Sequence, residues 1–141
     1  MKLFKKMKDG GPESTVTGYW LIEAKKLFSI VLLHFQDGSR DAYHSHAFNT
    51  ISWVLRGQLT ENRLVNPYRL DDKTNVTVYR PSLKPIFTSR DNYHKVVSAG
   101  DTWVISFRGP WADMWQEIYP GGGWVTLTHG REILEGGPGR P

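Results

Sequence analysis

Short segments rich in β-branched and aromatic residues recur along the whole chain, separated by Gly, Pro, Asn and Asp. This pattern predicts β-strands joined by tight turns, because such side chains suit a pleated sheet and such turn formers interrupt it. No segment has the periodicity of a long amphipathic helix. We therefore expect an all-β sandwich or barrel. The expected strands are Gly18–Lys25, Leu27–Phe35, Thr50–Leu55, Gln58–Val65, Val76–Arg80, Lys84–Thr88, His94–Ser98, Thr102–Phe107, Met114–Tyr119 and Trp124–Thr128.

The length of 141 residues suits a single domain. We expect its core to run from about residue 15 to 134, between a frayed basic segment, Met1–Ser14, and a tail of turn formers, Glu135–Pro141. Four lysines among the first eight residues account for the net charge of +4, so this charge is poor support for a nucleic-acid partner. No apolar run approaches the roughly 18 residues of a membrane span, and the first residues, MKLFKKMKDGG, lack the apolar stretch of a secretory signal. We therefore expect a cytoplasmic protein.

The chain contains no cysteine, so a metal site would have to be built from histidine, carboxylate and water. His44 and His46 are one residue apart, a spacing that puts both imidazoles on the same face of a strand. His94 follows a turn and opens a strand, so it could face the same cavity. Alternatively, His44 and His46 are ordinary polar residues of a barrel wall, held by hydrogen bonds. We expect His34 and His129 to be structural.

Two glycines, together with His44 and His46, carry a resemblance to a known family. Gly38, His44, His46 and Gly57 have the spacing of the first motif of the cupin superfamily, G-x5-H-x-H-x3–4-E-x6-G, with Thr50 in the place of its glutamate. The second cupin motif is degenerate here and is represented by the histidine position alone, in SRDNYHKVVS. The chain also resembles small cupin-like proteins of phages and bacteria. The resemblance spans residues 38 to 110.

This resemblance implies a cupin-type double-stranded β-helix, or jelly-roll barrel, in which His44, His46 and His94 bind one divalent metal ion. Three-histidine cupins include Fe(II) dioxygenases, so it implies iron, with manganese, nickel or zinc as alternatives. The expected activity is a dioxygenase-type reaction on a small anionic substrate. Glu61 could substitute for the missing glutamate, but we expect it to be an exposed strand residue.

Two further residues are candidates for catalysis. Strand alternation puts Arg108 on the same face as Thr102 and Ser106, where a guanidinium beside a metal could bind a carboxylate or phosphate. Tyr93 could form an aromatic wall or act in catalysis, although core packing explains it equally well. The same alternation puts Thr50 and Ser52 together on the cavity face.

Two other functions fit the same sequence. One is a non-catalytic cupin that binds a sugar, nucleotide or effector. The other is a metal-free sugar epimerase or isomerase, in which His44 or His94 acts as a base beside Tyr93. For either function we expect a small-molecule ligand and no membrane partner. A homodimer formed through the apolar segments YWLIEA and LFSIVLL is also expected.

Overall fold

A computed structural model describes residues 1–38, 42–69, 73–119 and 122–138. Within those residues the chain is made of β-strands, turns and loops, arranged in two antiparallel sheets. None of the described residues belongs to a helix that is long and apolar enough to cross a membrane.

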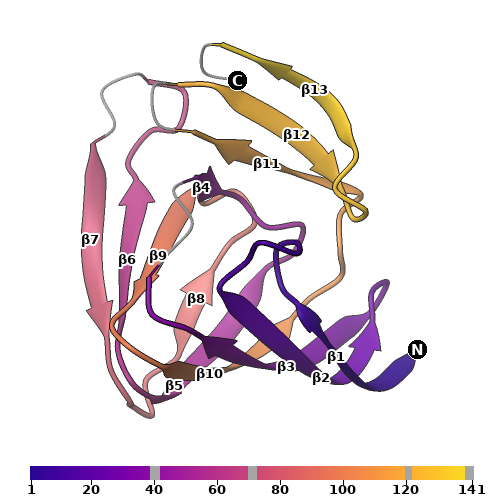
Figure 1. The fold of residues 1–141 in the computed structure, drawn as a ribbon, viewed down its shortest axis with the longest axis vertical. Helices are drawn as coiled ribbons and strands as arrows, with labels where there is room; N and C mark the ends of the chain where they lie inside the picture. The colour runs from indigo at the N-terminus through magenta and orange to yellow at the C-terminus, as the bar shows by residue number, and fades with distance from the viewer. Residues whose placement is uncertain (39–41, 70–72, 120–121, 139–141) are drawn as a thin grey trace.

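The two sheets form opposing walls around the interior (Figure 1). The six-stranded sheet contains β1 (Lys2–Lys8), β2 (Val16–Ala24), β3 (Phe28–Phe35), β10 (Thr102–Arg108), β5 (Thr50–Arg56) and β8 (Ile86–Thr88), in that spatial order. The seven-stranded sheet contains β13 (Ile133–Gly137), β12 (Trp124–Thr128), β11 (Met114–Ile118), β4 (Tyr43–His44), β9 (His94–Ser98), β6 (Leu59–Leu64) and β7 (Thr74–Tyr79). Neighbours such as β3 and β10, or β11 and β4, are distant in sequence, so the chain crosses repeatedly between the sheets.

All ten expected strands are present, and β9 and β12 have the expected bounds. Strands β1, β4 and β13 were not expected. Alternation along β10 is also as expected, because Thr102, Ser106 and Arg108 are buried while Phe107 is 40% exposed. The local pattern of side chains was therefore sufficient to locate most strands.

The chain ends differ from the expectation of a frayed segment and tail. Strand β1 pairs along β2 from Lys2 to Lys8, and β13 pairs with β12 from Ile133 to Gly137. The ammonium of Lys5 lies 2.9 Å from the carboxylate of buried Glu23, which ties the N-terminal strand to its neighbour. Of the tail, residues 139–141 lie outside the described part of the chain.

The edge of the six-stranded sheet has a consequence for self-association. The expected homodimer needed the edges of β2 or β3, but β1 covers β2, and β3 lies between β2 and β10. The edge strand on this side of the sheet is instead β1, which carries four lysines. Lysine-rich edge strands resist further strand pairing. Neither β2 nor β3 thus has a free edge within the described sheet, and the homodimer itself stays a prediction.

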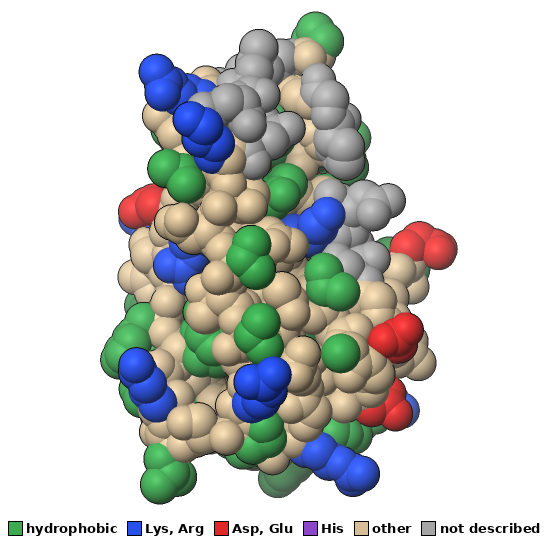
Figure 2. All heavy atoms as spheres, turned by 90° about the vertical axis from the view of Figure 1, so that its left-hand side faces the viewer, with side chains coloured by type: hydrophobic (Ala, Val, Ile, Leu, Met, Phe, Trp, Pro, Cys, Tyr) green, Lys and Arg blue, Asp and Glu red, His purple; other side chains and the backbone are tan. Residues whose placement is uncertain are grey.

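The main apolar core lies between the sheets. It consists of Trp20, Val31, Leu33, Val54, Leu59 and Val104, all nearly inaccessible to solvent. Full burial of one such side chain contributes about 1.5–3 kcal/mol, so this cluster is a major source of stability. Figure 2 shows the outside of the molecule on the side where β7 lies: hydrophobic and charged side chains are interspersed, and no histidine is visible on that face.

The turn between β5 and β6 depends on Gly57. Its φ angle is +91°, and a Cβ at this position would lie 2.5 Å from the Thr102 hydroxyl oxygen. That hydroxyl accepts a hydrogen bond from the Gln58 amide at 3.0 Å. A glycine is therefore required here both by the backbone conformation and by the close approach of β10.

Candidate metal centre

A cavity of about 600 Å³ opens between the two sheets. The described residues that line it include all three candidate metal ligands, together with Thr50 and Ser52, as strand alternation predicts. Much of the remaining wall is apolar or aromatic, formed by Trp20, Leu33, Phe48, Ile86, Val104 and Trp111. A concave, largely apolar space with a few convergent polar groups is the usual form of a small-molecule site.

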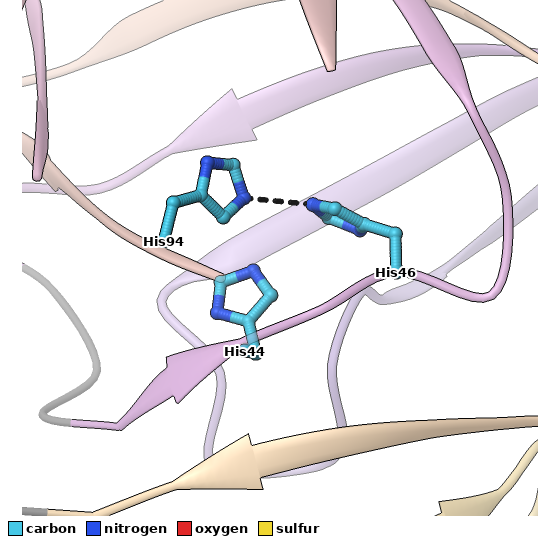
Figure 3. Close-up of side chains that lie close together, drawn as sticks. All are labelled: His44, His46 and His94. Carbon is cyan, nitrogen blue, oxygen red and sulfur yellow. Dashed lines mark hydrogen bonds between the residues drawn. The ribbon is translucent and has the colours of Figure 1, made fainter. Parts of the chain in front are cut away.

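Two neighbouring strands and a loop bring the three histidines together. His44 ends β4 and is paired in register with His94, which begins β9, while His46 follows β4 in the chain. Their ring nitrogens converge, with one ligand atom from each lying within 4.8 Å of the others (Figure 3). The Nε2 atoms of His46 and His94 are 2.8 Å apart. His94 is buried, and the other two are half-buried.

These distances fit the binding of one ion. Two nitrogens that each lie about 2.1 Å from a metal, at right angles to each other, are separated by about 3 Å. The observed separation between His46 and His94 is close to this value. All three ligand atoms lie within 4.8 Å of one another, a limit close to the roughly 4.2 Å that separates ligands on opposite sides of an ion.

Glu61 on β6 orients His94. Its Oε1 lies 2.5 Å from the Nδ1 of His94, and Glu61 is only 4% exposed. The expectation of an exposed strand residue was therefore wrong. Because an ionised carboxylate only accepts hydrogen bonds, Nδ1 donates, and in the neutral ring Nε2 keeps its lone pair directed toward the other histidines. Carboxylates commonly fix metal-binding histidines in this way.

The electrostatic surroundings keep Glu61 ionised. Burial by itself would raise the pKa of this carboxyl, but hydrogen bonding and charge from His94, reinforced by Arg63, lower it from 4.5 to about 2. The Arg63 guanidinium lies 3.1 Å from Oε1, and the Tyr79 hydroxyl donates to Oε2 at 3.0 Å. One feature of the sequence indicates this arrangement: Glu61 is two residues from the apolar Leu59, so both side chains point to the same, buried face of β6.

Arg108 lies inside the cavity, as strand alternation predicts. Its side chain is only 3% exposed and forms an ion pair with Asp9, with Nη2 at 2.6 Å from Oδ2. The guanidinium carbon lies 4.6 Å from the centre of the Phe48 ring, and the centre of that ring lies 5.3 Å from the centre of the His46 ring. One aromatic ring thus separates the buried cation from the histidine group.

Tyr93 is placed differently. It precedes His94 in the chain and packs against Leu64 and Ile118, and its hydroxyl donates a hydrogen bond to Gln116. It is not among the described residues lining the main cavity and instead borders a neighbouring hollow of about 250 Å³. Burial, together with the charge of Tyr68, raises the pKa of its hydroxyl. This position offers no support for a catalytic role in the main cavity.

The other two histidines lie outside the three-histidine group. His34 stacks on Trp103 with 4.4 Å between ring centres, and its Nε2 lies 3.1 Å from Asp101. His129 lines the cavity, but its Nε2 hydrogen-bonds to the carbonyl oxygen of Ala112 at 2.6 Å. Both arrangements are structural.

No protein-family model and no curated protein sequence matches this chain. Similarity is found among solved structures instead. A sugar phosphate isomerase of the cupin superfamily from Silicibacter pomeroyi has a TM-score of 0.60 at 12% identity, over 96% of this chain and 92% of that chain. An RmlC-like cupin from Shewanella frigidimarina has a TM-score of 0.52 at 17% identity, over 76% of this chain and 84% of that chain.

The Fe(II) form of HppE has a TM-score of 0.58 at 13% identity, over 74% of this chain and 55% of that chain. The chain thus spans about half the length of HppE. At these identities the similarity concerns the fold, and it agrees with the two antiparallel sheets and the histidine group described above. The chain has the cupin fold.

Proposed function

We propose that His44, His46 and His94 bind one Fe(II) ion and that the protein catalyses a dioxygenase-type reaction on a small anionic substrate. The observation that carries this proposal is the convergence of three imidazoles in one apolar cavity, with Glu61 orienting the most buried of them. The Fe(II) form of HppE, which has a similar fold, supports the choice of metal.

The ligand set explains why the substrate should be anionic. Three neutral imidazoles leave the charge of a divalent ion uncompensated, and Thr50 stands where the cupin motif has a glutamate. A carboxylate or phosphate from a substrate would supply the missing negative charge. Three histidines also leave coordination positions open, so the bound ion would supply redox chemistry and room for oxygen and substrate.

The protein itself would contribute orientation and exclusion of water. Glu61 holds the proton on His94 Nδ1, which keeps Nε2 available as a ligand. Trp20, Phe48 and Trp111 form an aromatic part of the cavity wall, which would limit the number of water molecules beside the histidines. Arg108 provides a buried cation one ring away from His46, where it could hold an anionic group.

Elemental analysis of the purified protein tests the proposal directly. We expect about one iron per chain in the unmodified protein and a loss of iron in the His44→Ala/His46→Ala variant. His34→Ala is the matched control, because it removes an imidazole outside the histidine group. Oxygen consumption would then be screened against thiols and small carboxylic acids.

Absence of stoichiometric metal after anaerobic reconstitution with Fe(II), Mn(II), Ni(II) or Zn(II) would overturn the dioxygenase proposal. Ligand binding that persists without metal would instead favour a non-catalytic cupin. A metal-free isomerase that uses Tyr93 has no specific support, because Tyr93 lies outside the main cavity and its pKa is raised.

A further inference from the structure

A buried ion pair between Arg108 and Asp9 connects the end of β1 to the cavity. Arg108, at the end of β10, is 99 residues from Asp9, yet Nη1 and Nη2 lie 3.3 and 2.6 Å from the two carboxylate oxygens. The Arg108 side chain is 3% exposed, whereas that of Asp9 is 28% exposed. The anion is therefore the more solvent-accessible member of the pair, and the cation is the buried member.

The surroundings of Arg108 are those of an anion site. Its guanidinium lies against the ring of Phe48 and 5.7 Å from the centre of the Trp20 ring, so little solvent screens its charge. Its buried Nε has no hydrogen-bond partner among the described residues. A guanidinium in this position matches a planar carboxylate or a phosphate, which can accept two of its hydrogen bonds at once. Asp9 occupies that position with a carboxylate of the protein itself.

The segment that carries Asp9 lies along the cavity between the two sheets. Residues 9–11 follow β1, and Gly10 and Gly11 have φ angles of +97° and +101°, which glycine adopts without strain. A Cβ at Gly11 would lie 2.8 Å from the Cδ atom of Arg131, beside the turn between β12 and β13. Asp9, Gly10, Gly11 and Pro12 all line the cavity. This segment thus links the six-stranded sheet, through Arg108, with the seven-stranded sheet.

We propose that a carboxylate or phosphate group of a ligand exchanges with the Asp9 carboxylate on Arg108, and that this exchange releases residues 9–12 from the cavity wall. The proposal rests on the small anionic substrate proposed above, but the exchange itself needs no metal. Asp9 is then an internal competitor that keeps the buried cation neutralised until an anion enters. No covalent bond changes, because one carboxylate–guanidinium pair replaces another.

The test is a calorimetric titration of EDTA-treated protein with inorganic phosphate and, separately, with succinate, at constant ionic strength. Asp9→Asn removes the competitor and is expected to bind one or both anions at least tenfold more tightly than the unmodified protein. The relative gains for phosphate and succinate show which anion the site prefers. Glu13→Gln is the matched control, because it removes an exposed negative charge from the same segment without altering the cavity lining.

Arg108→Met tests the cation. Combined with Asp9→Asn, it should abolish the gain in anion affinity. The double variant also removes the buried Arg108 charge that Asp9→Asn alone leaves unpaired and that could unfold that variant. A second readout is amide hydrogen exchange at Gly10 and Gly11 in the unmodified protein, which should accelerate when the anion is added. A purely structural ion pair would leave this exchange rate unchanged.

Two results would overturn the proposal: anion affinity of Asp9→Asn within twofold of the unmodified protein, or anion binding that survives Arg108→Met. Neither result bears on the metal, because both titrations use metal-free protein. Conversely, a protein that fails to retain iron could still show the exchange. The two proposals therefore succeed or fail separately.

Discussion

Replacing Glu61 with glutamine tests whether this carboxylate prepares His94 for metal binding. The substitution keeps the size of the side chain and an oxygen acceptor, but it removes the negative charge 2.5 Å from Nδ1. A hydrogen bond to a charged group contributes about 1.5–3 kcal/mol, roughly twice the value for a neutral pair. We therefore expect a loss of about 1–2 kcal/mol, which corresponds to a decrease in metal affinity of about tenfold or somewhat more.

The assay is a competition titration of Fe(II) or Zn(II) against a chromophoric chelator, at a temperature well below the unfolding transition. Circular dichroism of each variant shows whether the fold is retained. Glu132→Gln is the control, because it removes an exposed carboxylate that does not belong to the group formed by His44, His46 and His94. Metal affinity of a folded Glu61→Gln variant within threefold of the unmodified protein would refute the orienting role.

Three further predictions concern stability. The pKa of Glu61 is lowered from 4.5 to about 2, so its ionised form stabilises the metal-free fold fully above pH 4.5, and this contribution is lost as the pH falls toward 2. Urea unfolding should show a loss of about 3 kcal/mol in the unfolding free energy over that pH range, and this loss should be absent in Glu61→Gln. Parallel pH profiles of the unmodified protein and the variant would contradict this prediction. Gly57→Ala should destabilise the fold by roughly 1–3 kcal/mol, and by more than Gly38→Ala does. Both glycines have positive φ, but of the two only Gly57 has atoms within 4 Å of the added Cβ. Equal losses of unfolding free energy in the two variants would argue against the steric contribution. Lys5→Met should lower the unfolding free energy by about 2 kcal/mol, because it removes the ammonium 2.9 Å from the buried Glu23. Lys2→Met, at an exposed position, should change the unfolding free energy by less than about 0.5 kcal/mol. A similarly small loss for Lys5→Met would show that β1 is loosely held.

The sequence by itself determined ten of the strands and the ligand candidates. Alternation of apolar and polar residues is a local property, because successive side chains of a strand point to opposite faces. It was enough to locate ten strands and to orient Arg108 inward. The one-residue spacing of His44 and His46 likewise brought two imidazoles to one side of the chain without reference to any other strand.

Only the tertiary structure decided which groups act on those candidates. Glu61 looks like an ordinary charged strand residue until β6 pairs with β9 and its carboxylate meets His94. The N-terminal segment looks like a solvated tail until β1 pairs with β2 and Asp9 reaches Arg108. Both contacts join residues far apart in the sequence, and local periodicity carries no information about which strands become neighbours. The partners of the histidines and of the buried cation are therefore set by strand order, a property of the whole fold.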